Sequence, residues 1–189
     1  MDVASYQPRD LTALITEHNV KHVVVRMYLP GETPSPDHSR AQVTSALLNG
    51  CSVSPYMWAY RSFDPVASVR NALQVARSEG LDPAILWLDC ETYLDVDHGP
   101  AVTWLLRAVR ECGRRGVLAG LYSAVWWLQG YLQDWSDFTG LPLWLAQYDG
   151  NPTLDDVVLP AGWRPDMLWG KQYSADGIDL DVFRRAATE

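Results

Sequence analysis

Long apolar runs are missing from this sequence of 189 residues. None approaches the roughly 20 residues that a helix needs to span a bilayer, so we expect no membrane insertion. A signal peptide is not visible either, because residues 1–8 are typical of a strand and its turn. If the protein acts outside the cell that makes it, a feature not visible in these residues must deliver it.

Positive charge is also in short supply. The chain has 15 Lys and Arg residues against 23 Asp and Glu residues, a formal net charge of −8. Nucleic-acid-binding proteins usually present a basic patch, and attraction to an anionic surface needs the same excess of positive charge. The composition therefore argues against nucleic acid as a partner. With 48% hydrophobic and 20% charged residues, it indicates one ordinary globular domain over residues 1–189.

Cysteine and histidine are scarce and scattered. Three cysteines cannot all pair, and their expected positions at a strand start, within a strand and on a helix favour buried free thiols. The four histidines lack the spacing of metal ligands, and we expect them at surface or loop positions. No metal and no cofactor are predicted. The residues concerned are Cys51, Cys90, Cys112, His18, His22, His38 and His98.

Tryptophan and tyrosine, by contrast, are abundant, with nine of each. This number exceeds what a core of this size needs. Aromatic faces stack on the apolar faces of sugar rings and line a groove at low entropic cost, so we expect about half of these side chains to fill the core and the others to be available for binding.

One apolar run, residues 84–91, is typical of a buried strand and ends in two carboxylates. Side chains alternate along a strand, so Asp89 and Glu91 share one face, with Cα atoms roughly 6.5–7 Å apart. Leu86, Leu88 and Cys90 form the other face, which suits packing against helices. Two carboxyl groups on one face suit acid–base chemistry, because each makes the other harder to ionise. The alternative is an ordinary helix cap or a solvated loop.

The rest of the chain alternates short apolar runs with amphipathic segments. We expect strands over residues 2–5, 21–28, 51–60, 84–91, 117–124, 143–148, 168–173 and 178–183, and helices over residues 9–17, 37–49, 65–79, 100–115 and 125–132. Five strand–helix units followed by three strands predict an α/β fold, an irregular TIM-like (β/α)5(β)3 barrel, because the last three strands can close against the first. Active sites of such barrels lie at the carboxyl ends of the strands, where Asp89 and Glu91 fall.

Three further carboxylates fall near the ends of the expected sheet. Asp2 starts the first strand, and Asp179 and Asp181 lie on the last. These strands are neighbours in a closed barrel, so Asp2 and Asp179 could converge with Asp89 and Glu91 over one cavity. Four acids in one cavity perturb each other's pKa values, which yields both a protonated acid and an ionised partner. Alternatively, Asp2 belongs to a frayed terminus, and Asp179 and Asp181 belong to a turn.

Six segments carry a resemblance to a known family. They are Asp2-Val-Ala-Ser-Tyr-Gln7, Trp87-Leu-Asp-Cys-Glu91, Gly120-Leu-Tyr-Ser-Ala-Val-Trp-Trp127, Leu143-Trp-Leu-Ala-Gln-Tyr148, Gln172-Tyr-Ser174 and Gly177-Ile-Asp-Leu-Asp-Val-Phe183. In this order they resemble the catalytic domain of glycoside hydrolase family 25, the Chalaropsis-type lysozymes of bacteria, fungi and phages. The resemblance covers essentially the whole chain and implies the same irregular barrel. It also implies hydrolysis of the β-1,4 bond between N-acetylmuramic acid and N-acetylglucosamine in bacterial cell-wall peptidoglycan.

Carried over position by position, the resemblance implies a role for each acid. Glu91 matches the general acid/base, and Asp89 matches the residue that orients and polarises the 2-acetamido group of the substrate. Asp2 and Asp179 match supporting carboxylates at the floor of the site, and we interpret Asp181 as structural. Because Asp89 shares a strand with Glu91, it is poorly placed for in-line attack, which favours assistance by the acetamido oxygen of the substrate.

The resemblance also implies five groove residues near strand ends, where aromatic stacking and amide hydrogen bonds hold the glycan. They are Tyr56, Tyr122, Trp144, Gln147 and Gln172. The sequence departs from the family pattern at the groove rim. Residues 26–32 replace a Lys-Ala-Ser/Thr-Glu-Gly-like segment, and Met57 replaces a histidine. These changes concern substrate subsites more than the reaction.

Two other interpretations stay open. The chain could be a non-catalytic glycan-binding or virion structural module on the same fold, although converging carboxylates are costly for a module that only binds. It could also be a metal-dependent hydrolase whose acids hold Mg²⁺ or Ca²⁺. The favoured prediction is a monomeric, metal-independent lysozyme that acts on the bacterial cell wall. Without a signal peptide, we expect either a phage endolysin released from the host cytoplasm by a separate pathway or a trimmed secreted domain.

Overall fold

The computed structural model describes residues 1–31, 36–91, 98–132, 136–175 and 177–184. Its strands are β1 (Asp2–Val3), β2 (His22–Tyr28), β3 (Ser52–Trp58), β4 (Ile85–Cys90), β5 (Leu118–Ala124), β6 (Leu143–Ala146), β7 (Leu168–Ser174) and β8 (Leu180–Phe183). Its helices are α1 (Thr12–Glu17), α2 (Pro36–Leu48), α3 (Pro65–Ser78), α4 (His98–Arg114) and α5 (Val125–Tyr131), with the 3₁₀ segments η1 (Ser136–Phe138) and η2 (Pro165–Met167). Each strand and helix expected from the sequence is present, with bounds that differ by a few residues.

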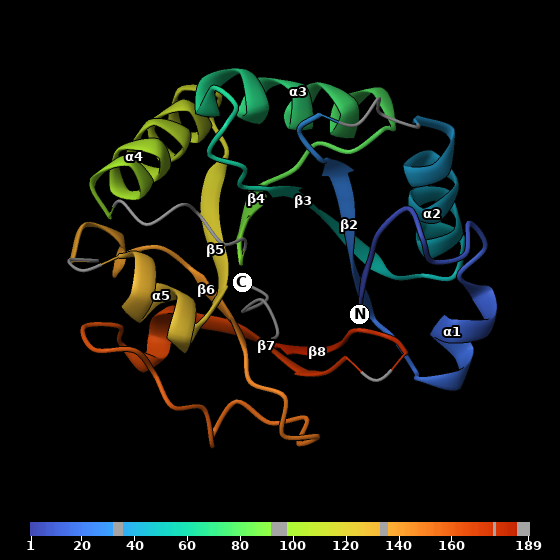
Figure 1. Cartoon of the computed structure of the whole chain (residues 1–189). Coiled ribbons are helices and arrows are strands. Elements are labelled where there is room, and N and C mark those ends of the chain that lie inside the picture. Colours follow the sequence, from blue (N-terminus) through green and yellow to red (C-terminus); the bar gives the residue numbers. More distant parts are fainter. Residues whose placement is uncertain (32–35, 92–97, 133–135, 176, 185–189) are drawn as a thin grey trace.

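The strands form one eight-stranded sheet in which sequence neighbours are also spatial neighbours, from β1 to β8. Strands β1 to β7 run parallel, whereas β8 pairs antiparallel with β7. The β7–β8 connection is too short for the crossover that a parallel pair needs, so the chain forms a hairpin. The sheet curls until the Asp2 N–H donates a hydrogen bond to the Asp179 C=O at 3.2 Å, which nearly closes it (Figure 1). This arrangement confirms the predicted irregular TIM-like barrel.

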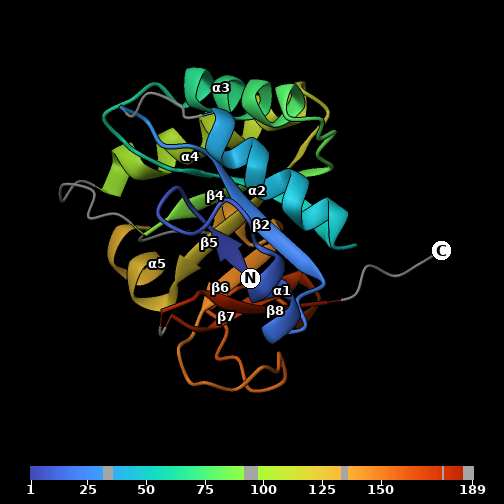
Figure 2. The same cartoon turned by 90° about the vertical axis from the view of Figure 1, so that its right-hand side faces the viewer.

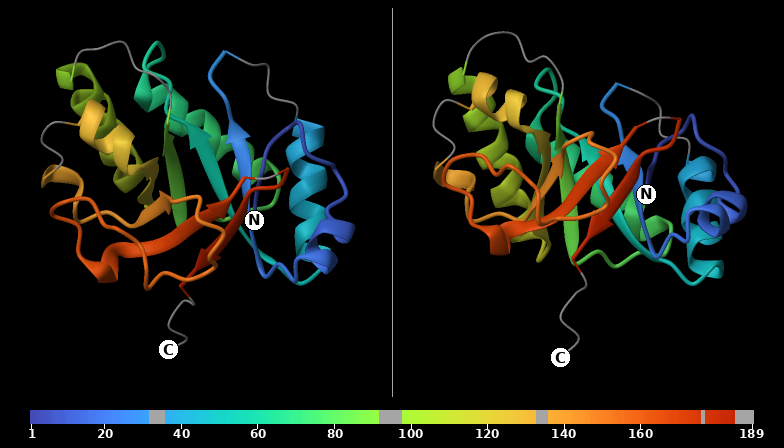
Figure 3. Two further views of the ribbon diagram at one scale, coloured as in Figure 1. Left: turned by 60° about the horizontal axis from the view of Figure 1, so that its bottom comes forward. Right: turned by 90° about the horizontal axis from the view of Figure 1, so that it is seen from below.

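Helices cover only part of the barrel. Helices α3 and α4 pack against each other and over β2, β3 and β5, and α2 lies over β2 and β3 with α1 beside it (Figures 1 and 2). Leu86, Leu88 and Cys90 of β4 point into the layer below α3 and α4, as predicted. Beside β7, the segment of residues 147–163 takes the place of an α-helix (Figure 3). None of the helices in the described residues has the length and apolar character that crossing a membrane requires.

Aromatic rings fill the barrel interior. The rings of Trp87, Trp144 and Phe183 contact one another with centroid separations of 5.5 to 5.9 Å. Gly120 makes room for them, because a Cβ atom there would lie 2.4 Å from the Trp87 ring. The tryptophans divide between core and surface, as expected: Trp87, Trp104, Trp127, Trp144 and Trp163 are buried, whereas Trp126 and Trp169 are exposed.

The cysteines are buried free thiols, as predicted. The expectation of a surface or loop position is wrong for His22, which begins β2. Its ring Nδ1 and Nε2 atoms lie 2.7 and 2.9 Å from the hydroxyl oxygens of Ser52 and Ser54, and Phe183 packs edge-on against it. Burial lowers the pKa of His22 to about 4. A neutral imidazole held by two hydroxyls is therefore part of the amino-terminal end of the barrel.

Candidate active site

A cavity of about 190 Å³ opens at the carboxyl ends of the parallel strands. Every strand of the sheet contributes to it, either directly or through a residue next to the strand. Its lining consists of Asp2, Tyr6, Arg26, Tyr56, Trp58, Asp89, Glu91, Tyr122, Trp144, Tyr148, Gln172 and Asp179. The fold thus brings together eight of the nine site residues predicted from the sequence, and Gln147 is the exception.

Asp89 and Glu91 lie where β4 ends. Asp89 is 4% exposed and pairs in the sheet with Trp58 of β3 and Tyr122 of β5. The Asp89 C=O accepts a hydrogen bond from the Ala59 N–H at 2.8 Å, whereas its carboxylate Oδ1 has no hydrogen-bond partner among the described residues. Glu91 follows the strand and is half-buried. Asp89 is therefore the enclosed acid of the pair, and Glu91 is the accessible one.

The other two acids, Asp2 and Asp179, come from the seam of the barrel, which is the place where β1 meets the chain just before β8. Asp2 in β1 is 7% exposed and accepts a hydrogen bond from Gln172 Nε2 at 2.8 Å. Asp179 precedes β8, and because β8 runs antiparallel, its start lies at the end of the barrel where the other strands finish. Burial, and then the charges of Asp181 and Asp179, raise the pKa of Asp2 well above its ordinary value, and burial raises the pKa of Asp179. Both acids are therefore held at a cost in free energy, and the alternative of a frayed terminus is wrong for Asp2. Asp179 lies in the connection just before β8, not on the strand as expected, whereas Asp181 lies in β8.

The Asp89–Glu91 pair has the electrostatics of a proton-sharing site. Burial and then the Glu91 charge raise the pKa of Asp89 well above its ordinary value, against the lowering effect of Arg26. Burial and then the Asp179 charge raise the pKa of Glu91, against the lowering effect of the nearby Tyr122 hydroxyl. Two carboxyl groups that oppose each other's ionisation can supply one acid and one anion in the same site.

Within the described residues, no group of three or more His, Cys, Asp or Glu side chains could hold a metal ion.

Hydrogen bonds of the Gln172 side chain connect Asp2 to two tyrosines of the cavity. Gln172 Oε1 accepts hydrogen bonds from the Tyr122 hydroxyl at 2.5 Å and from the Tyr148 hydroxyl at 2.8 Å. Gln172 Nε2 donates to Asp2 on the other side. Both ends of the Gln172 amide are thus occupied, which fixes the two tyrosine hydroxyls at the cavity.

Trp144 of β6 lines the cavity and is otherwise buried. It is 1% exposed, its ring centroid lies 4.3 Å from that of Tyr122, and its Nε1–H donates to Asp181 Oδ1 at 2.8 Å. Asp181 does not line the cavity, and its carboxylate also pairs with the amino group of Met1 at 3.1 Å. These contacts agree with the interpretation of Asp181 as a structural residue.

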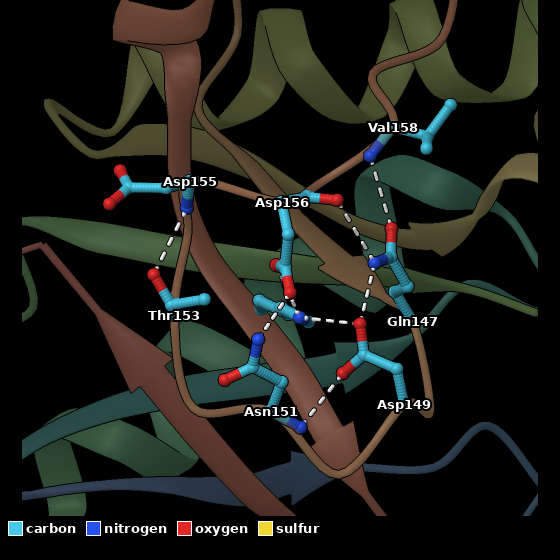
Figure 4. Close-up of polar contacts among 8 residues, drawn as sticks. Gln147, Asp149, Asn151, Thr153, Asp155, Asp156 and Val158 are labelled. Carbon is cyan, nitrogen blue, oxygen red and sulfur yellow. Dashed lines mark hydrogen bonds and ion pairs between the residues drawn. The ribbon is translucent and has the colours of Figure 1, made fainter.

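Gln147 does not line the cavity, in contrast to the prediction. Trp144 and Ala146 face the barrel interior, so alternation along the chain places Gln147 on the outside and Tyr148 on the inside. The Gln147 side chain instead donates to Asp149 Oδ2 at 2.7 Å and accepts from the Val158 N–H at 3.1 Å (Figure 4). Gln147 therefore stabilises a loop, and Tyr148 lies at the cavity where Gln147 was expected.

Sequence reasoning missed four lining residues: Tyr6, Arg26, Trp58 and Tyr148. A signal for three of them exists in the strand alternation. Arg26, Trp58 and Tyr148 each lie two residues after an interior residue, which is Val24, Tyr56 or Ala146. Tyr6 lies in the turn after β1, where no alternation applies, and only the tertiary structure places it at the cavity.

A family model described as glycosyl hydrolases family 25 matches residues 1–182. The chain is similar to Counting factor 50 of Dictyostelium discoideum, with 26% identity over 128 residues that cover 62% of this chain and 41% of that protein. It is also 28% identical over 153 residues to Probable GH family 25 lysozyme 3 of the same organism, covering 74% of this chain and 31% of that protein. The chain thus spans about two fifths or less of the length of these curated relatives.

Solved structures show the same fold. A muramidase from Acremonium alcalophilum superposes with a TM-score of 0.78 and 21% identity, over 98% of this chain and 93% of that chain. The modular Cpl-1 endolysin, solved with a peptidoglycan analogue, superposes with a TM-score of 0.75 and 19% identity, over 100% of this chain and 54% of that chain. At these identities the likeness establishes the fold of the barrel.

Proposed function

This chain belongs to the glycosyl hydrolases family 25, and on that premise we propose that it is a peptidoglycan hydrolase, a lysozyme that cleaves the β-1,4 bond between N-acetylmuramic acid and N-acetylglucosamine. The observation that carries the proposal is the convergence of Asp2, Asp89, Glu91 and Asp179 in one aromatic-lined cavity. The names of its relatives, a lysozyme, a muramidase and an endolysin, support the same substrate class.

Glu91 is the proposed general acid. Cleavage of a glycosidic bond needs a proton on the leaving oxygen. The raised pKa of Glu91 keeps a proton available closer to neutral pH than an ordinary carboxyl group does, and its half-buried position gives access to substrate. Glu91 is the more accessible of the two acids, since Asp89 is 4% exposed.

Asp89 is the proposed partner of the substrate's 2-acetamido group. Its Oδ1 has no hydrogen-bond partner among the described residues, so this oxygen is available to accept the acetamido N–H. An ionised Asp89 also offsets the positive charge that develops when the acetamido oxygen attacks the anomeric carbon. Burial and then the Glu91 charge raise the pKa of Asp89, and the Arg26 charge opposes that rise. A protonated Glu91 carries no charge, so the proton on the general acid removes one of the two effects that disfavour an ionised Asp89.

The proposed reaction has two steps. The acetamido oxygen bonds to the anomeric carbon while the glycosidic C–O bond breaks, and the proton of Glu91 moves to the leaving oxygen. Water then adds to the anomeric carbon, the bond to the acetamido oxygen breaks, and ionised Glu91 takes a proton from that water. Two inversions at one carbon give a product that retains the β configuration.

Products released from a defined cell wall test this reaction. We expect mass spectrometry to find fragments with N-acetylmuramic acid at the reducing end, and NMR during the first minutes to find the β anomer. Fragments that end in N-acetylglucosamine would reject the bond specificity, and initial release of the α anomer would reject the assisted route.

No release from several wall types would favour a glycan-binding module, whereas activity lost in EDTA and restored by Mg²⁺ or Ca²⁺ would favour a metal-dependent hydrolase.

The pH dependence of catalysis should respond to Arg26, the only Lys or Arg side chain among the described residues that line the cavity. The Arg26 charge lowers the pKa of Asp89, and the proposed mechanism needs Asp89 ionised. In Arg26→Gln the pKa of Asp89 should rise, so the acidic limb of the kcat/KM profile should move to higher pH by about half a unit to one unit. Profiles of wild type and variant on soluble glycan strands measure this shift.

Ser5→Ala is the matched control for Arg26→Gln. The Arg26 guanidinium donates a hydrogen bond to the Ser5 hydroxyl at 2.6 Å, so Ser5→Ala removes a contact of Arg26 and keeps its charge. We expect its acidic limb to coincide with that of wild type. An unchanged limb in Arg26→Gln, or equal shifts in both variants, would show that the Arg26 charge does not set this limb.

A further inference from the structure

Lys171 is a fully buried lysine on the outer face of β7, with 0% of its surface exposed. Its neighbour Gln172 points into the catalytic cavity, so alternation turns Lys171 away from it. The outer face of a barrel strand usually packs beneath an apolar helix surface. Here the segment of residues 147–163 takes that place (Figure 3). Because a buried ammonium ion is costly unless it is paired, that segment must supply its partners.

Two aspartates of this segment supply them. Lys171 Nζ lies 2.8 Å from Asp149 Oδ2 and 2.8 Å from Asp156 Oδ1. Burial acts to lower the pKa of Lys171, but the two aspartates outweigh it and the pKa is raised. The same contact, with help from Gln147, holds the pKa of Asp149 well below its ordinary value. Lys171 is therefore a charged ion at the centre of the loop.

The loop of residues 147–158 supplies both partners of this ammonium ion, and its own side chains are joined by further polar contacts (Figure 4). Asp149 Oδ1 accepts from the Asn151 N–H at 2.9 Å, and Asp156 Oδ2 accepts from Asn151 Nδ2 at 2.6 Å. Gln147 Nε2 donates to Asp149 Oδ2 at 2.7 Å. Loops with closely spaced oxygen side chains commonly wrap a metal cation, and in this loop the lysine ammonium ion occupies the centre. Each carboxylate oxygen of Asp149 and Asp156 has a partner.

The loop also carries Tyr148, the aromatic residue at the mouth of the catalytic cavity. Tyr148 lies between Gln147 and Asp149, and the side chains of both neighbours belong to the network around Lys171. The backbone on either side is tied to β7, with the Gln147 N–H donating to the Gln172 C=O at 3.0 Å and the Gly150 N–H donating to the Tyr173 C=O at 2.9 Å. The Tyr148 ring is 59% exposed, so this anchorage determines where its hydroxyl meets Gln172.

We propose that Lys171 is a positioning residue for the active site: its ammonium ion, acting as an internal counter-ion in place of a bound metal, folds the 147–158 loop so that Tyr148 is held against Gln172 at the cavity mouth. The expected kinetic effect rests on the proposed function, because Tyr148 is taken to contact the glycan. The placement of Tyr148 follows from the structure and does not depend on that function.

Lys171→Met keeps most of the side-chain volume and removes the charge. We expect the KM for soluble peptidoglycan strands to rise about tenfold and kcat to change less than about threefold, because a glycan contact is lost and the acids remain in place. Asp156→Asn, at a half-exposed position, weakens one of the two ion pairs without burying a free charge, and we expect a smaller rise in KM. It keeps the inference testable if Lys171→Met does not fold.

Asp155→Asn is the matched control for Asp156→Asn. Asp155 lies in the same loop, but its carboxylate points away from Asp156, and its N–H donates to the Thr153 hydroxyl (Figure 4). We expect its KM to equal that of wild type. Asp155→Asn and Asp156→Asn each remove one negative charge from the loop. If Asp155→Asn raises KM as much as Asp156→Asn does, the effect comes from the net charge of the loop and the inference fails.

A double-mutant cycle separates positioning from general stability. If Lys171 acts through Tyr148, Lys171→Met should raise KM in the wild type but not in a Tyr148→Ala background. A rise of equal size in both backgrounds would overturn the inference.

Crystal structures of Lys171→Met and wild type give a readout that needs no activity, and an unchanged contact between Tyr148 and Gln172 would also overturn it. Lack of wall hydrolysis by the wild type would instead reject the proposed function and leave this structural comparison valid.

Discussion

Glu91→Gln is expected to lower kcat for cell-wall hydrolysis by roughly 10³-fold, in the middle of the range for loss of a general acid. Glutamine keeps the shape of the side chain, but it has no proton to give to the leaving oxygen and cannot take one from water. Both proposed steps lose their proton carrier. The release of reducing ends from purified peptidoglycan measures the effect, with turbidity loss of whole walls as a second assay.

Folding of the Glu91→Gln variant can be checked through its stability. Folding raises the pKa of Glu91, so this carboxyl group favours the folded state below its unfolded pKa, and that contribution is lost as pH rises through the folded pKa. At neutral pH the ionised group therefore opposes burial, and the neutral glutamine should give an equal or higher Tm. Low activity together with an undiminished Tm assigns the loss to chemistry. Glu17→Gln, an exposed change on α1, should leave both quantities unchanged.

The leaving group provides a sharper test of the same residue. An aryl glycoside whose phenolate leaves without a proton does not need a general acid in the first step. We expect Glu91→Gln to lose much less activity on the first turnover of such a substrate than on peptidoglycan. Equal losses on both substrates would show that Glu91 does something other than protonate the leaving oxygen.

The fold could be predicted from the sequence because its signals are local. Apolar runs and amphipathic segments alternate five times, and three more runs follow with little helix between them. The closure of the barrel then brings Asp2 beside Asp179, although they are far apart in sequence. Strand order alone therefore predicts that the four acids converge.

The finer features of the site depend on which face each residue occupies. Extending the alternation from Trp144 predicts that Tyr148 faces the cavity, whereas the prediction of Gln147 depends on its likeness to a family position. The role of Lys171 had no signal in the sequence, because a lysine on a predicted strand is ordinarily solvent-exposed. Its burial follows from the path of the loop that covers β7, and that path depends on contacts between Lys171, Asp149 and Asp156.

Asp89→Asn is expected to lower kcat on peptidoglycan by roughly 10²-fold, because the variant loses the charge that stabilises the ring formed by the acetamido group. Asparagine can still accept the acetamido N–H through its oxygen, so KM should change little. Burial and the Glu91 charge raise the pKa of Asp89, so Asp89 opposes folding once pH rises through its folded pKa, and Asp89→Asn should gain stability at neutral pH. Kinetics and thermal unfolding at pH 7 measure both effects.

The role of Asp89 is decided by a mimic of the intermediate. A thiazoline analogue of the sugar, in which sulfur replaces the acetamido oxygen of the closed ring, should inhibit the wild type and bind Asp89→Asn much more weakly, since a stable mimic of a reactive species reports the same stabilisation. Asp89 contributes to this binding only if it faces the acetamido group. If mass spectrometry instead traps a 2-fluoro sugar covalently bound to Asp89, then Asp89 is the nucleophile, and assistance by the substrate is wrong. Both routes retain the β configuration, so the identity of the group bonded to the anomeric carbon, and not the stereochemistry, distinguishes them.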